Sequence, residues 1–193
     1  MIRCDALIVG GGPAGSTCAR RLRLAGWDVV VADRARFPRD KVCAGWLTPE
    51  VFSALELDPA EYRASGRTLV DITAFRTSVI GRRPIETAYP HVVSYSVRRR
   101  EFDEFLLRRA GVRVVEGMPI GAVRRNGGTW LANDQIEAPV LIGAGGHFCP
   151  VAKAIRPARE TIKPVVAKEA EFRCNWRSRL VEPHTPQLFF CED

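Results

Sequence analysis

Three glycines near the N-terminus have the spacing of a phosphate-binding turn. The pattern is Gly10-x-Gly12-x-x-Gly15. It follows an apolar run at 6–9, which predicts a buried strand, and precedes a helical pattern that begins at Pro13. In this setting the glycines permit a tight turn, close approach of a pyrophosphate to the backbone, and close packing of helix on strand. The N–H groups and positive potential of the helix N-terminus then favour bound phosphate.

One acidic residue completes this pattern. Residues 27–32 form a second apolar run, which predicts a parallel strand that leads into Asp33. Asp33 follows the glycines at close to the spacing of about 20 residues at which a carboxylate accepts hydrogen bonds from a ribose diol. Residues 5–33 are therefore predicted to form a strand, a helix and a strand that bind a dinucleotide.

Other nucleotide chemistries fit these residues less well. Residues 10–17 also match a Walker A pattern, but Ser16 stands where that pattern needs a lysine for the β- and γ-phosphates. No tyrosine is followed by lysine at the Tyr-x-x-x-Lys spacing of a short-chain dehydrogenase. Arg34 could pair with the 2′-phosphate of NADP, whereas Asp33 would repel it, so the residues alone leave FAD and NAD open.

The rest of the chain must position this turn. Residues 67–97 read as strands inserted into the domain, and a short helix is expected near Thr48. Asn126 and the two glycines after it predict a hairpin. The remaining predicted elements are a helix at 99–110, strands at 112–115, 120–125, 129–132 and 140–143, and a strand at 164–173 that opens a new region.

Composition limits the class of protein. Hydrophobic residues make up 46% and charged residues 26% of the chain, which excludes a disordered or collagen-like protein. A net charge of +7 favours anionic partners without choosing among them. The six cysteines form no C-x-x-C pair, and His147 with Cys149 has no further ligand nearby in sequence, so no metal site is expected. The sequence offers no signal peptide and no membrane-spanning run, which predicts a cytoplasmic location.

Several segments resemble one group of flavoproteins. Residues 5–16 and 31–34 resemble the FAD-binding start of glutathione-reductase-like flavoproteins. Three more segments look like blocks of the geranylgeranyl reductase family and of its relatives among the FAD-dependent monooxygenases and halogenases. These segments are 41–45, 99–103 with Leu106 and Ala110 following, and 142–146. The order and spacing agree across nearly all of residues 3–173.

The resemblance implies a fold and a cofactor. The fold is α/β, a Rossmann-like FAD/NAD(P)-binding domain with a parallel sheet and an inserted β-rich segment. It places the FAD-binding domain at 1–160, with the insertion at about 67–97, and the start of a truncated substrate domain at 161–193. The cofactor is FAD, with NAD(P)H as a candidate electron donor. The implied cofactor-binding residues are Gly10, Gly12, Pro13, Ala14, Gly15, Asp33, Arg34, Cys43, Ala44, Gly45, Arg99 and Ile120.

The resemblance gives each of these residues a role, and for three of them a structural alternative stays open. The glycine turn would hold the FAD pyrophosphate, Asp33 the ribose and Arg34 the adenine. Arg99 would reach the FAD from its helix, or be a solvated charge in the run 98–100. Ile120 would meet the adenine with its backbone, or be a core residue. Cys43 is the candidate for a catalytic thiol beside the flavin, or a small residue buried in a tight loop.

One departure from the family bears on the reaction. Gly145 stands where the family has an aspartate that, in the monooxygenases, helps to hold the cofactor and is linked to the nicotinamide donor. We therefore expect hydride transfer from reduced FAD to a C=C bond of an isoprenoid or other small lipophilic substrate. The alternatives are an FAD-dependent hydroxylase and a truncated, non-catalytic dinucleotide-binding module. No nucleic acid partner is expected, and peripheral membrane contact is an option.

Overall fold

The computed structural model describes residues 1–155, 166–172 and 182–191. Contacts divide the chain into two compact units. Unit 1 comprises Met1–Asp40 with Arg100–Val165, and unit 2 comprises Lys41–Arg99 with Val166–Asp193. The boundary predicted between residues 160 and 161 lies outside the described residues. Each unit is therefore described by itself.

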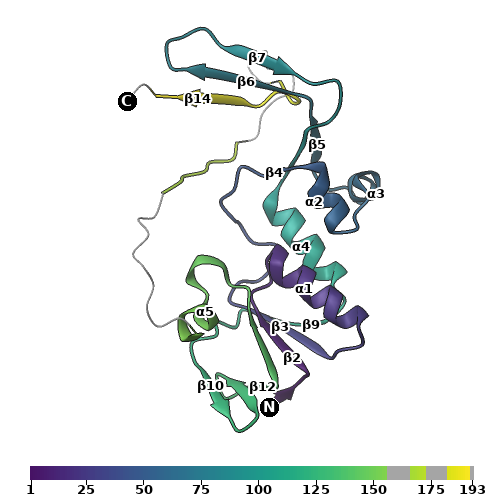
Figure 1. Ribbon diagram of the computed structural model, residues 1–193, viewed down its shortest axis with the longest axis vertical. Helices are drawn as coiled ribbons and strands as arrows, with labels where there is room; N and C mark the ends of the chain where they lie inside the picture. The colour runs from purple at the N-terminus through teal and green to yellow at the C-terminus, as the bar shows by residue number, and fades with distance from the viewer. Residues whose placement is uncertain (156–165, 173–181, 192–193) are drawn as a thin grey trace. The chain divides into compact units, whose positions relative to one another are not determined.

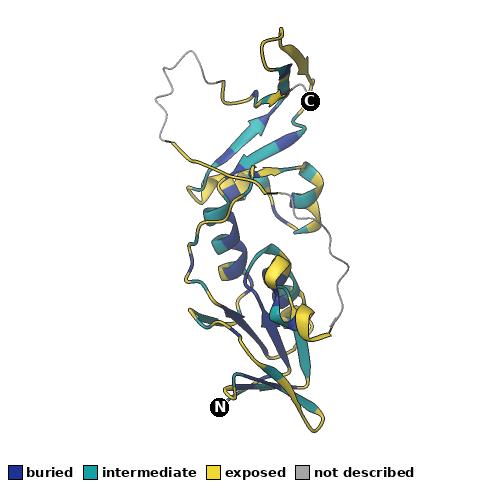
Figure 2. Ribbon diagram, turned by 90° about the vertical axis from the view of Figure 1, so that its left-hand side faces the viewer, coloured by how far each residue is buried: buried dark blue, intermediate teal, exposed yellow. Residues whose placement is uncertain are grey.

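Unit 1 is built on a fully parallel sheet. Its strands are β2 (Ala6–Val9), β3 (Val29–Asp33), β9 (Arg113–Glu116) and β13 (Val140–Gly143). They pair in the order β13-β2-β3-β9. Every residue of β2 and β3 is buried, as expected for parallel strands covered on both faces. Figure 2 shows these strands in dark blue. In this order β2 lies between β3 and β13, as the first strand of a Rossmann-like sheet does. The predicted fold class is therefore confirmed.

Helices cover one face of this sheet. α1 (Pro13–Leu24) follows β2 directly, and α4 (Arg99–Arg109) precedes β9 (Figure 1). Ala19 of α1 and Leu107 of α4 pack with Ile8 and Val31 of the sheet. Ala14, in the first turn of α1, is exposed.

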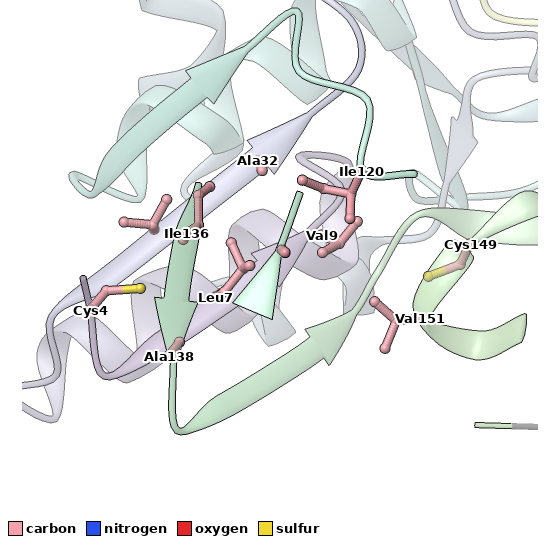
Figure 3. Packing of buried hydrophobic residues seen from close by; sticks show 11 residues of the cluster. Cys4, Leu7, Val9, Ala32, Ile120, Ile136, Ala138, Cys149 and Val151 are labelled. Carbon is pink, nitrogen blue, oxygen red and sulfur yellow. The ribbon is translucent and has the colours of Figure 1, made fainter. Parts of the chain in front are cut away.

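A second sheet covers the other face. It pairs β1 (Ile2–Arg3), β12 (Ile136–Ala138), β11 (Thr129–Ala132) and β10 (Val123–Asn126). A short helical turn (Gly146–Phe148) and α5 (Pro150–Ile155) follow β13. Figure 3 shows Leu7 and Val9 facing Ile136, Ala138 and Ile120 across this core. Unit 1 is thus a three-layer structure whose glycine turn lies at the carboxyl edge of the parallel sheet.

Unit 2 contains two further sheets. One joins β4 (Trp46–Leu47), β8 (Ser94–Val97) and β5 (Leu69–Ile72), and the other joins β14 (Gln187–Phe190), β6 (Ala74–Val79) and β7 (Ile85–Ala88). Two short helices, α2 (Pro49–Ala54) and α3 (Pro59–Ala64), accompany them. The strands expected between residues 67 and 97 are therefore present.

Two local predictions are wrong. A strand was expected at 164–173, yet residues 166–172 have no regular structure, and the ends of that range lie outside the described residues. Residues 120–122 precede β10 instead of belonging to it, because the side chain of Asn133 accepts hydrogen bonds from the N–H groups of Gly121 and Ala122 in place of a ladder partner. In the described part of the chain, no helix combines the length and the apolar character needed to cross a membrane.

Candidate cofactor-binding site

The glycine turn is sterically closed to any larger residue. Gly10 has a φ of +115°, and a Cβ built on it would lie 2.5 Å from the carbonyl oxygen of Ala144. A Cβ on Gly15 would overlap the carbonyl oxygen of Gly10. These two glycines therefore let the end of β2, the start of α1 and the end of β13 meet without side chains between them.

The N-terminus of α1 emerges from this turn. Gly12 is its N-cap and Pro13 its first residue, and in the described structure no side chain caps it and no acidic residue lies in its first turn. The hydroxyl of Ser16 donates to the carbonyl of Gly11 at 2.9 Å, which ties the helix back to the turn. Gly12 and Pro13 are half-buried and Ala14 is exposed. The helix N-terminus is thus open to an anion.

Asp33 fixes the turn to the neighbouring strand. Its carboxylate accepts hydrogen bonds from the N–H of Gly11 at 2.7 Å and from the N–H of Ala35 at 2.8 Å. The side chain is buried, and each oxygen keeps further acceptor capacity. A carboxylate held in this way, beside a glycine turn at the end of a parallel strand, is suited to accept hydrogen bonds from a ribose diol.

The two residues predicted near the adenine lie in different environments. Arg34 is exposed directly after β3. The side chain of Ile120 is 7% exposed and packs in the core with Val9 and Ala32 (Figure 3). Only the backbone of Ile120 is therefore available for the predicted contact. Its loop is tied to the site because the N–H of Met118 donates to the carbonyl of Asp33 at 2.9 Å.

A match to a protein-family model identifies the family of this chain. The profile described as FAD dependent oxidoreductase matches residues 5–106, a segment that contains the glycine turn and Asp33. The chain belongs to the FAD-dependent oxidoreductase family. The cofactor of this family is FAD.

Individual relatives agree with this assignment. A menaquinone reductase of Mycobacterium tuberculosis is 30% identical over 181 residues, which cover 85% of this chain and 43% of the relative. A geranylgeranyl diphosphate reductase of Rhodobacter capsulatus is 34% identical over 145 residues, covering 73% of this chain and 32% of the relative. The crystal structure of pqsL, a probable FAD-dependent monooxygenase from Pseudomonas aeruginosa, shares the fold at a TM-score of 0.66 and 22% identity, covering 84% of this chain and 48% of that one. The chain spans less than half the length of each of these relatives.

The turn fits the FAD that the family binds. Gly10 and Gly15 leave no room for side chains, the N–H groups of α1 are not capped by a side chain in the described structure, and the carboxylate of Asp33 lies beside the turn with acceptor capacity to spare. These features match the needs of a pyrophosphate and the ribose beside it. The structure therefore brings together the predicted residues of unit 1 that surround the turn.

Other predicted site residues lie in unit 2. Gly45 has a φ of +73°, and a Cβ on it would overlap the carbonyl oxygen of Val97. Its N–H donates to the sulfur of Cys43 at 3.5 Å, and the N–H of Cys43 donates to the carboxylate of Glu169 at 2.9 Å. Ala44 between them is exposed, and Arg99 is the half-buried first residue of α4. This loop is tightly held within unit 2, and its contact with the cofactor stays a prediction.

Gly145 is close to a neighbouring backbone. A Cβ built on it would lie 3.3 Å from Cα and 3.5 Å from Sγ of Cys149. Cys149 itself is buried and packs with Val151 in the core of unit 1. An aspartate at position 145 would therefore require Cys149 to shift by a few tenths of an ångström. Among the described residues there is no group of histidine, cysteine or acidic side chains able to hold a metal ion.

One ion pair at the turn was not predicted from the sequence. Arg39 forms an ion pair of 3.2 Å with Asp103, which is completely buried on α4. Arg39 belongs to the basic stretch at 34–41, which the sequence assigns as a group to the neighbourhood of the FAD phosphates, so nothing local distinguishes Arg39 within it. Asp103 did carry a signal, because it shares a helical face with Leu107 and Ala110, at spacings of four and seven residues. An acid on an apolar helix face predicts a buried partner.

Proposed function

We propose that this chain forms the FAD-binding part of a flavoenzyme. The observation that carries the proposal is that Asp33, at the carboxyl edge of the parallel sheet, accepts hydrogen bonds from the N–H of Gly11 in the glycine turn and from the N–H of Ala35. Dinucleotides bind at this edge of such sheets because the helix N-terminus and the acidic strand end converge there. The chain would bind FAD in an extended form along this edge.

Each residue near the turn has a defined role in this proposal. The backbone N–H groups of Gly12, Ala14 and Gly15 bind the pyrophosphate, while Pro13, which has no N–H, starts the helix. Asp33 accepts hydrogen bonds from the adenosine ribose. Arg34 and the backbone of Ile120 lie along the adenine. Cys43, Ala44 and Gly45 line the flavin side, with Cys43 as the candidate thiol. Bound FAD would supply hydride transfer chemistry, while these residues bind and orient it.

We further propose that the reaction is reduction of a C=C bond in an isoprenoid or other small lipophilic substrate. The names of the two relatives, a menaquinone reductase and a geranylgeranyl diphosphate reductase, support a reductase. The glycine at position 145 supports it too, because the acid linked to nicotinamide handling in the monooxygenases is absent. NAD(P)H remains a candidate donor. Cytoplasmic location and peripheral membrane contact stay predictions.

FAD titration tests the binding proposal. The purified chain should take up FAD, acquire a flavin absorption spectrum and bleach with dithionite. Asp33→Ala should weaken FAD binding by about tenfold or more, because hydrogen bonds to a charged group contribute about 1.5–3 kcal/mol. Asp28→Ala is the matched control, since Asp28 directly precedes the opposite end of the strand that Asp33 ends. Protein that stays colourless with excess FAD would refute the proposal.

Product analysis separates the reaction classes. The chain loaded with FAD and reduced by dithionite is mixed with geranylgeranyl diphosphate in the absence and presence of O₂. Saturation of a C=C bond without O₂ consumption supports the reductase. A hydroxylated product with O₂ consumption supports the second candidate, a monooxygenase of the kind whose fold this chain shares. Tight FAD binding with neither product supports a non-catalytic binding module.

A further inference from the structure

The guanidinium of Arg39 lies beside the glycine turn. A Cβ built on Gly12 would lie 3.5 Å from Nη2 of Arg39, in otherwise open space. The same nitrogen forms the 3.2 Å ion pair with Asp103. Only 19% of the Arg39 side chain is exposed, and the Asp103 side chain is fully buried. The guanidinium therefore lies on the side of Gly12 where a side chain would project.

Two neighbours hold the guanidinium in this place. Asp103 reaches it from α4, and the ring of Phe37 lies 4.9 Å below its central carbon. Phe37 in turn would contact a Cβ on Gly11 at 3.3 Å, so the ring packs directly against the turn. A buried carboxylate without a cation is strongly unfavourable, which keeps the pair together before any ligand binds. The stacked ring limits rotation of the guanidinium plane.

This arrangement supplies the cation that the turn itself lacks. Ser16 occupies the position of the lysine in a Walker A loop, so no cation within the turn faces a bound phosphate. A guanidinium offers five N–H donors in a planar fork, and Asp103 can engage only part of them. The rest can donate to an anion that also accepts from the backbone at Gly12 and from the N-terminus of α1.

We propose that Arg39 donates hydrogen bonds to the pyrophosphate bound at the glycine turn, and that Asp103 is the positioning residue that aims it. This inference rests on the proposed binding of FAD. It adds a donor from outside the turn and gives α4 a part in nucleotide binding through its buried acid. The ligand chemistry is a diphosphate carried on a nucleoside, so ADP is a sufficient probe.

The test measures ADP and FAD affinity by calorimetry. Arg39→Gln should weaken ADP binding by more than about tenfold, because it removes charged donors while the carboxylate of Asp103 stays near the phosphates. The double variant Arg39→Gln/Asp103→Asn also removes the buried charge of Asp103 and should fold like the parent by circular dichroism and thermal unfolding. Its ADP affinity should stay at least about tenfold below the parent. Arg124→Gln is the matched control, because Arg124 of β10 also pairs with an aspartate, the exposed Asp134 in the turn between β11 and β12.

Asp103→Asn alone tests positioning. It removes a negative charge near the phosphates, so a purely electrostatic role for Asp103 predicts unchanged or tighter ADP binding. A positioning role predicts weaker binding, because the guanidinium loses its anchor. Parent-like ADP affinity in a folded double variant would overturn the inference while leaving FAD binding intact. A parent that binds neither FAD nor ADP would overturn the proposed function, and this inference with it.

Discussion

Close backbone contact explains why the turn needs glycine at particular positions. At Gly15 the obstacle to a side chain is the carbonyl oxygen of Gly10, the residue that directly follows β2. Backbone at this position can move only if α1 separates from β2. At Gly121, by contrast, a Cβ would meet no atom within 4 Å. The two glycines offer a direct comparison of a required and a replaceable residue.

We predict that Gly15→Ala destabilises unit 1 and abolishes FAD binding. The added methyl group should lower the free energy of unfolding by about 1–3 kcal/mol, the usual effect of overpacking. Gly121→Ala should change it by less than about 0.5 kcal/mol, as is usual for exposed substitutions. Urea unfolding followed by circular dichroism measures both. Equal stability of the two variants would show that α1 can move away from β2 at little cost.

The residues of the turn were predictable one by one, whereas the basic stretch at 34–41 was assigned to the phosphates only as a group. Gly10, Gly12, Gly15 and Asp33 follow from spacing, because each serves a local need of the strand, turn and helix. The contact of Arg39 depends on where α4 packs, which is a property of the assembled fold. A basic residue at the surface and one beside an anion site look alike in sequence.

Elements with long apolar runs were predicted well, whereas short ones were missed. β2, β3, β9 and β13 were expected because parallel strands covered on both faces read as continuous apolar runs. β1 and β12 contain only two and three residues, too few for a period to be recognised. Beside the backbone ladder, the carboxylate of Glu137 accepts hydrogen bonds from Thr129 of β11 at 2.9 Å and from Arg3 of β1 at 3.3 Å.

Acid should weaken this second sheet through Glu137. The hydrogen bond from Thr129, together with those from Asn126 and Arg3, lowers the pKa of Glu137 below its ordinary 4.5. Stabilisation from a lowered pKa is fully present above that ordinary value and is lost as pH falls through the lower, folded-state pKa. Glu137→Gln should therefore lower the Tm at neutral pH, and the difference from the parent should shrink below pH 4.5. A difference in Tm that persists unchanged in acid would contradict this role.

At the scale of the whole molecule, net charge says little about where free cations lie. The basic clusters at 34–41 and 98–100 suggest a strongly positive site, yet several members pair with acids. Arg39 pairs with Asp103 in unit 1, and Arg98 pairs with Glu171 at 3.1 Å in unit 2. The segment 166–172 forms no strand, but Glu169 accepts a hydrogen bond from the N–H of Cys43 and Glu171 pairs with Arg98. Its apolar residues suggested a strand, but its hydrogen bonds use side chains, which periodicity does not reveal.

The predicted site draws residues from both units, which makes ligand contact testable segment by segment. The turn, Asp33 and Ile120 belong to unit 1, whereas residues 43–45 and Arg99 belong to unit 2. ADP contains only the part of FAD assigned to unit 1. Amide hydrogen exchange of the chain with excess ADP should therefore protect residues 10–16 and 33–35 and leave 43–45 unchanged.

Excess FAD should protect the same segments of unit 1 and also residues 43–45, because its flavin is assigned to the loop that contains Cys43. Protection of 43–45 by FAD but not by ADP would support that assignment independently of any turnover measurement. Protection confined to unit 1 with both ligands would show that Cys43, Ala44 and Gly45 do not contact the cofactor in this chain. The tight turn at Gly45 would then serve only the folding of unit 2, where its N–H and carbonyl already bind Cys43 and Val97.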